Sequence, residues 1–180
     1  MMKKVTGYIL ILILISLSTG LKAQDWEIYR GKNDLSGQTE IPLPAKPGLL
    51  WTLKTDCRTV SSPVVYRGNI YFGNNDGDLI AVEPGGKIKW KYETGTAIEA
   101  SPLVVGGKII VGSLDGVLRA IDAESGKLLW QYETGNQISG SANIWIDEDE
   151  SMVIVGSYDY FLHCIDPRTG RFMWKLETNN

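Results

Sequence analysis

The residue types that most often carry enzyme chemistry are scarce in this sequence and poorly placed for it. Its single histidine, His163, lies between Leu162 and Cys164 in an alternating run, and no serine or cysteine stands in a recognisable nucleophile context. We interpret His163 as a strand residue that either faces solvent or has its hydrogen bonds satisfied. The sequence therefore predicts no catalytic residue.

The sequence also contains few residues that could bind a metal ion or form a disulfide. Asn74-x-Asp76-Gly77 followed by Glu83 superficially resembles a calcium loop, but its first ligand position would be Phe72, and Asp-Gly is typical of a hairpin turn. One histidine and two cysteines leave almost nothing for a zinc site. We predict a turn at this segment and no metal ligand anywhere.

The two cysteines are predicted to stay unpaired. Cys57 and Cys164 fall in different structural units, and Cys164 replaces an alanine at a position that faces the core. The acidic run Asp147 to Glu150 could touch a cation, but a solvated loop is the usual meaning of such a run.

The first 23 residues have the order of a secretory signal. Lys3 and Lys4 precede an apolar run from Tyr8 to Ile15, and small and polar residues follow up to Ala23. This run is shorter than the ~20 apolar residues that span a bilayer, and no cysteine follows it. We therefore expect a bacterial protein exported to the periplasm or beyond, with cleavage near Ala23 and no transmembrane or lipid anchor afterwards.

Composition fits an ordinary globular domain with an acidic surface. Hydrophobic residues make up 43% of the 180-residue chain, enough for a packed core. The formal charge of −3 becomes more negative once the three lysines of the signal segment are removed, which excludes nucleic acid as a partner.

A repeat of about forty residues organises the rest of the chain. Trp51, Trp90, Trp130 and Trp174 are spaced by 39, 40 and 44 residues, and the longer interval is explained by the acidic insertion at 147–150. Each unit has four short runs rich in β-branched, leucine and aromatic residues; in the second unit they cover 102–105, 108–113, 117–121 and 127–132. Glycine-rich pairs between the runs suit tight hairpins.

Four antiparallel strands per repeat predict an all-β chain, a β-propeller. We expect a lead-in segment at 24–48 and propeller repeats at 49–180, with blades at about 61–94, 101–134 and 141–178. An orphan outer strand at 49–55 precedes them, so the ring would be incomplete. An open arc would leave strand edges through which copies of the chain could associate.

The turn before each outer strand has a repeated pattern, Ala120-x-Asp122-x-x-x-Gly126-x-x-x-Trp130 in the second unit. The aspartate can accept N–H groups of the turn, the glycine can adopt a left-handed conformation, and the tryptophan can bury its ring between blades. The predicted docking positions are Trp51, Trp90, Asp122, Gly126, Trp130, Asp166, Gly170 and Trp174.

This pattern resembles the tryptophan-docking motif of the PQQ-like (pyrroloquinoline quinone) propeller repeats, from Trp51 to Trp174. The segment Asp25–Gly31 is also similar to the Trp-x-x-x-Arg-Gly lead-in of that family. The dehydrogenases of this family hold PQQ with adjacent cysteines, a tryptophan platform and a calcium cluster. The resemblance would imply the same groups in a PQQ-binding chain, and none of them can be placed in this sequence. We therefore predict no cofactor, PQQ and calcium being expected only if their ligands lie in missing blades. The non-enzymatic, BamB-like branch, which binds partner proteins, is the better match.

The links from one blade to the next supply the candidate binding surface. Polar residues recur there at or near equivalent positions: Arg58, Glu99, Asn136, Gln137 and Ser139. We expect this rim to contact a partner protein or a small ligand, because its side chains vary while the scaffold repeats. Plain solvated loops are the alternative.

Three functions remain open from the sequence. The first is an exported, non-catalytic propeller that acts as a binding or scaffolding module, as the N-terminal part of a larger propeller. The second is a fragment of a PQQ-dependent dehydrogenase, and the third is an extracytoplasmic sensor domain.

Overall fold

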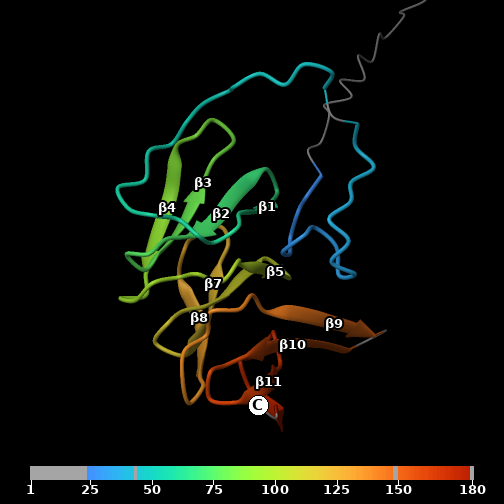
Figure 1. The fold of residues 1–180 in the computed structure, drawn as a ribbon, viewed down its shortest axis with the longest axis vertical. Helices are drawn as coiled ribbons and strands as arrows, with labels where there is room; N and C mark the ends of the chain where they lie inside the picture. Colours follow the sequence, from blue (N-terminus) through green and yellow to red (C-terminus); the bar gives the residue numbers. More distant parts are fainter. Residues whose placement is uncertain (1–23, 43, 148–149, 179–180) are drawn as a thin grey trace, which may run out of the picture.

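Three four-stranded antiparallel sheets follow one another along the chain (Figure 1), as the repeat predicts. The structure, a computed structural model, describes residues 24–42, 44–147 and 150–178. Blade 1 contains β1 (Val64–Tyr66), β2 (Asn69–Gly73), β3 (Asp78–Val82) and β4 (Ile88–Glu93). Blade 2 contains β5 (Leu103–Val105), β6 (Lys108–Gly112), β7 (Val117–Asp122) and β8 (Leu128–Glu133). Blade 3 contains β9 (Asn143–Asp147), β10 (Glu150–Gly156), β11 (Phe161–Ile165) and β12 (Phe172–Glu177).

Each blade is a meander in which every strand pairs with the next one in sequence. The pairing between the third and fourth strands shifts register at the same place in all three blades, at Ala81/Val82, Ala120/Ile121 and Cys164/Ile165. Such an irregularity bends the strand just before the turn to the outer strand. The three units are thus the same structure repeated.

The core lies between blades, since blade 2 buries both of its faces. Ile109 and Ile121 pack in a cluster with residues of blade 1, whereas Ile110 and Leu118 pack in a second cluster with residues of blade 3. Successive side chains of a strand point to opposite faces, so one apolar run supplies both clusters. The three blades form an open arc, and the described side chains of β12 are all exposed.

The lead-in segment lies beside the first strands of blades 1 and 2 (Figure 1). Trp26 forms a β-bridge with Val65, and the Val104 N–H donates to the Glu27 carbonyl over 2.7 Å. Ile28 is buried in the cluster between blades 2 and 3. The segment therefore covers the inner edges of β1 and β5 and ties the two blades together.

Residues 49–55 differ from the predicted orphan strand. They belong to no hydrogen-bonded ladder, although Trp51 of this segment packs on blade 1. A strand is defined by backbone hydrogen bonds to a neighbour, and no strand among the described residues pairs with this segment.

Candidate functional site

Backbone hydrogen bonds hold all three links to the following blade and two of them to the preceding blade. Toward the following blade, the carbonyls of Arg58, Ala97 and Gln137 accept the N–H groups of Asn75, Leu114 and Tyr158 over 3.0, 3.1 and 2.9 Å. The three acceptors occupy equivalent positions in the repeat. The links of this propeller are therefore fixed to the same geometry three times.

Toward the preceding blade, the second and third links are anchored by an isoleucine. The Ile98 N–H donates to Asn74, the Ile138 N–H donates to Ser113, and both side chains are fully buried. Each isoleucine lies where a side chain on Gly73 or Gly112 would stand, which explains the glycine that ends the second strand of these blades.

The rim residues predicted from the sequence project from these anchored links. Arg58, Glu99, Asn136 and Gln137 are exposed, and Ser139 is half-buried. Asn136, Gln137 and Ser139 share one link, whereas Arg58 and Glu99 belong to the other two. Ser139 also lines a cavity of about 500 Å³ with Tyr158 and Tyr160 of blade 3.

The tryptophans at the repeat positions contact the turn of the following blade. The indole N–H groups of Trp51, Trp90 and Trp130 donate to the carbonyls of Pro84, Ala123 and Pro167 over 2.7, 3.1 and 3.1 Å. Their rings cover the glycines of those turns, which have φ values of +83°, +69° and +73°: Gly86, Gly126 and Gly170. Trp174 is 41% exposed and has no following turn in the described part of the chain.

The aspartates of the same turns organise the backbone beneath the rings. The Asp122 carboxylate accepts the N–H and hydroxyl of Ser125 over 2.7 and 2.6 Å, and these bonds hold the pKa of Asp122 below its ordinary value. Asp166 accepts the Arg168 N–H over 2.9 Å in the equivalent turn. These contacts suit structural roles for both carboxylates.

His163 is the centre of a hydrogen-bonded chain across the interface of blades 2 and 3. It is 3% exposed; Nδ1 lies 2.9 Å from the Tyr132 hydroxyl, and Nε2 lies 3.0 Å from the Asp159 carboxylate. Because a carboxylate only accepts hydrogen bonds, Nε2 carries the proton that lies between His163 and Asp159. Burial and the nearby Asp159 raise the pKa of Tyr132, which keeps its hydroxyl a donor. Of the two interpretations of His163, the structure selects the satisfied strand residue.

The hydrogen bonds that join Tyr132, His163 and Asp159 were not predicted from the sequence, although the sequence contains a signal for one of the two contacts. Asp159 and His163 occupy the positions of Asp115 and Arg119 in blade 2, where the guanidinium lies 2.6 Å from the carboxylate. An aspartate followed four residues later by arginine or histidine at equivalent positions of the two blades indicates a repeated pair of hydrogen-bonded side chains. The Tyr132 partner could not be found this way, since it comes from another blade.

Protonation of the Asp159 carboxylate should contribute to a lower free energy of unfolding at acid pH. Burial acts to raise the pKa of this carboxyl, but hydrogen bonds from the Gly135 N–H and His163 outweigh it, so the pKa lies below the ordinary value of 3.8. A carboxyl with a lowered folded-state pKa contributes stability above its unfolded pKa, and this is lost as the pH falls through the folded value. We expect Asp159→Asn to lose less stability between pH 7 and pH 3 than the unchanged protein, measured by urea unfolding. Parallel stability curves for the two proteins would contradict this.

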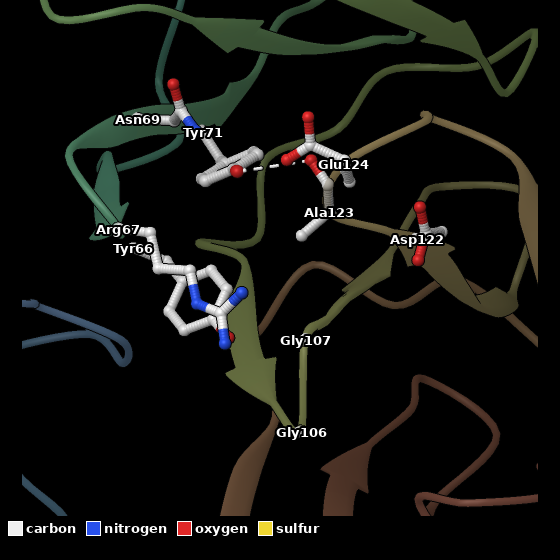
Figure 2. A pocket seen from close by; sticks show the side chains of 9 residues that line it. All are labelled: Tyr66, Arg67, Asn69, Tyr71, Gly106, Gly107, Asp122, Ala123 and Glu124. Atoms are coloured by element: carbon white, nitrogen blue, oxygen red, sulfur yellow. Dashed lines mark hydrogen bonds between the residues drawn. The ribbon is translucent and has the colours of Figure 1, made fainter.

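A cleft of about 410 Å³ opens between blades 1 and 2, at the end of the blades away from the links (Figure 2). The Tyr71 hydroxyl donates to the Ala123 carbonyl over 3.2 Å, and the Arg67 guanidinium lies 5.1 Å from the Tyr66 ring centre. Glu124 is paired with Lys89 over 2.8 Å. The lining of the cleft suits hydrogen bonding to a small polar molecule. The lining residues are Tyr66, Arg67, Asn69, Tyr71, Gly106, Gly107, Asp122, Ala123 and Glu124.

Three further features singled out in the sequence are the calcium-like turn, the two cysteines and the acidic insertion. Asn74 closes the predicted turn, with its side-chain oxygen accepting the Asp78 N–H over 2.8 Å. Cys57 and Cys164 are free thiols, the second one buried. Of the acidic insertion, Asp147 and Glu150 are exposed, and 148–149 lie outside the described residues.

The described residues contain no group of three or more acidic, histidine or cysteine side chains that could hold a metal ion. In the same part of the chain, no helix is long and apolar enough to cross a membrane.

Three similar four-stranded sheets, packed in chain order with tryptophans between them, define an open β-propeller arc. The family model described as "Outer membrane protein assembly factor BamB" matches residues 44–180. The chain belongs to this family of PQQ-like propeller repeats. No curated protein matches the sequence.

Solved structures agree on the fold. The crystal structure of BamB from Moraxella catarrhalis is 26% identical with a TM-score of 0.60, over 71% of this chain and 40% of that one. A europium-containing methanol dehydrogenase is 19% identical with a TM-score of 0.70, over 87% of this chain and 32% of its own length. The quinohemoprotein alcohol dehydrogenase from Comamonas testosteroni is 21% identical with a TM-score of 0.70, over 85% and 27% of the two chains. The chain thus spans well under half of each of these proteins.

Proposed function

We propose that this chain is part of an exported, non-catalytic β-propeller that binds a partner protein through its interblade links. The observation that carries the proposal is the repeated anchoring of these links. Their backbones bond to the following blade at equivalent carbonyls, while the side chains at those three positions differ: Arg58, Ala97 and Gln137. A rigid scaffold that presents varied side chains is a typical binding surface.

The similarity to BamB supports this class of function. The family model, which matches this chain from residue 44 to residue 180, is described as an outer membrane protein assembly factor. Export is proposed only from the secretory-signal order of residues 1–23, which lie outside the described residues. A partner protein suits the exposed polar rim better than a small ligand does, since the rim extends over three separate links.

A PQQ-dependent dehydrogenase fragment is the second candidate, favoured by the TM-scores of 0.70 to two dehydrogenases. The residues of this chain do not fit a PQQ site. Cys57 and Cys164 are not adjacent, and the rings of Trp90 and Trp130 are covered by the turns of the following blades. We therefore propose no cofactor for the described blades, and any PQQ or calcium ligands would come from other blades.

Site-specific photocrosslinking in the exporting cell tests the binding role. A photoreactive amino acid at Arg58 or Gln137 should yield several-fold more of one discrete crosslinked product than the same amino acid at Lys87 or Lys127. These two control lysines are also exposed but lie in turns at the other end of the blades. Once the partner is identified, Arg58→Ala/Glu99→Ala should weaken its affinity about tenfold. Equal labelling at the four positions, or unchanged affinity, would overturn the proposal.

A further inference from the structure

The first hairpin of blade 3 is longer than those of the other two blades. In blades 1 and 2 the first strand has 3 residues and the second has 5, whereas β9 has 5 and β10 has 7. β11 pairs with β10 only from Val153 onward, so Trp145–Asp147 and Glu150–Met152 pair solely with each other. We call these six residues the blade 3 ribbon. Figure 1 shows β9 extending away from the rest of the blade.

The inner edge of β9 lacks the cover that the inner edges of β1 and β5 have. Val65 of β1 and Val104 of β5 donate their N–H groups to Trp26 and Glu27 of the lead-in segment. Ile144 is the equivalent residue of β9, and its N–H bonds instead to the side chain of Asn143 over 2.8 Å. The inner edges of this propeller thus accept an added extended chain twice, and β9 is left as an edge strand among the described residues.

Ile146 is the position where a strand could add. Backbone groups of a strand point alternately to its two sides, so the N–H and carbonyl of Ile146 point in the same direction as those of Ile144, away from β10. The side chain of Ile146, on the same face of β9 as Ile144, is 59% exposed. A two-stranded ribbon with exposed apolar residues and a free edge is marginal alone and is stabilised by a further strand.

The negative charge at the end of the blade 3 ribbon indicates what kind of strand would add to it. Asp147 and Glu150 face each other across the ribbon at its end, and both are exposed. Their ion pairs with other side chains are absent from the described residues, where the five ion pairs involve other carboxylates. An added strand with a lysine or arginine at this end would neutralise them.

We propose that the blade 3 ribbon binds an extended, basic segment of a partner protein, which adds as a strand beside Ile146. The backbone of the segment bonds to the free edge, an apolar side chain packs on Ile146, and a basic side chain pairs with Asp147 and Glu150. This docking site is separate from the rim, since it uses no link residue. It can therefore fail or hold independently of the proposed function of the links.

The test measures binding of a synthetic peptide to the full chain by fluorescence anisotropy. The probe alternates valine with lysine and threonine over about nine residues, the length of an ordinary strand. A matched peptide carries glutamate in place of lysine. We expect the lysine peptide to bind, to bind more weakly as salt is added, and to slow hydrogen exchange in residues 143–147 and 150–152. The glutamate peptide should bind at least about tenfold more weakly.

Two variants and a control locate the binding. Ile146→Pro removes an N–H that points out of the edge and leaves the β9–β10 hydrogen bonds intact, and it should weaken binding about tenfold. Asp147→Lys/Glu150→Lys should do the same without changing the core, which keeps the test decisive if the proline variant does not fold. Glu93→Lys/Glu133→Lys makes the same charge change on the outer strands and should leave binding unchanged.

Three results would overturn the proposal. They are no binding of the lysine peptide, equal binding of the two peptides, and equal loss of binding in the ribbon variants and the Glu93→Lys/Glu133→Lys control.

Discussion

Replacing Trp130 with alanine is expected to lower the free energy of unfolding by about 3–5 kcal/mol. The ring is 9% exposed, covers Gly170 of blade 3, and donates its N–H to the Pro167 carbonyl over 3.1 Å. Its loss removes the packing between blades 2 and 3 and leaves a cavity that the turn cannot fill. Urea unfolding of the full chain, followed by circular dichroism, measures the change.

Trp174→Ala is the matched control for this prediction. Trp174 has the same place in its repeat but is 41% exposed, so its loss should cost less than about 1 kcal/mol. Trp130→Phe keeps most of the ring and removes the N–H donor, and should cost about 1–2 kcal/mol. Equal destabilisation by the two alanine substitutions would show that the interblade contact does not stabilise the propeller.

Replacing Gly112 with alanine is expected to lower the free energy of unfolding by about 2–3 kcal/mol. A Cβ at this position would overlap the side chain of Ile138, which is fully buried and is fixed by the hydrogen bond from its N–H to Ser113. Either the third link moves or the interface of blades 2 and 3 opens. The same urea unfolding experiment measures the loss.

Gly156→Ala provides the control, because Gly156 ends the second strand of blade 3 in the same way. The nearest atom to its added Cβ is Leu162 Cδ2 at 3.6 Å, an ordinary contact, so the change should stay within about 0.5 kcal/mol. A second substitution, Ile138→Ala, should reduce the cost of Gly112→Ala in that background, because it removes the Cγ2 atom that overlaps most and leaves only the Cβ of residue 138, at 2.8 Å. Additive losses in the double variant would contradict the proposed overlap.

Much of the fold could be predicted because the same local pattern occurs three times. Glycine turns between short apolar runs specify the four antiparallel strands of one blade. The regular spacing of the four tryptophans shows that this unit is repeated, and a repeated blade specifies a propeller. The strand boundaries in blade 2 match the prediction within one residue at each end. The segment at 49–55 has no strand in the structure, because pairing depends on a neighbour and not on the segment itself.

The candidate site was predictable only in part. The rim positions follow from the spacing of the links, and the structure places them on backbones that are anchored alike. The position of the lead-in on β1 and β5 had no signal in the repeat, since the segment precedes it. The cleft of Figure 2 combines turns from two blades that are far apart in the sequence.

The sequence by itself determined the blade, its repetition and the class of propeller, because hairpins, turns and strand periodicity depend on residues close together in the chain. Only the tertiary structure decided which side chains meet across the blades. Tyr132 contacts His163 from 31 residues away, and Tyr71 reaches Ala123 from 52 residues away. Such contacts depend on how whole sheets pack, and no local pattern of residues specifies them.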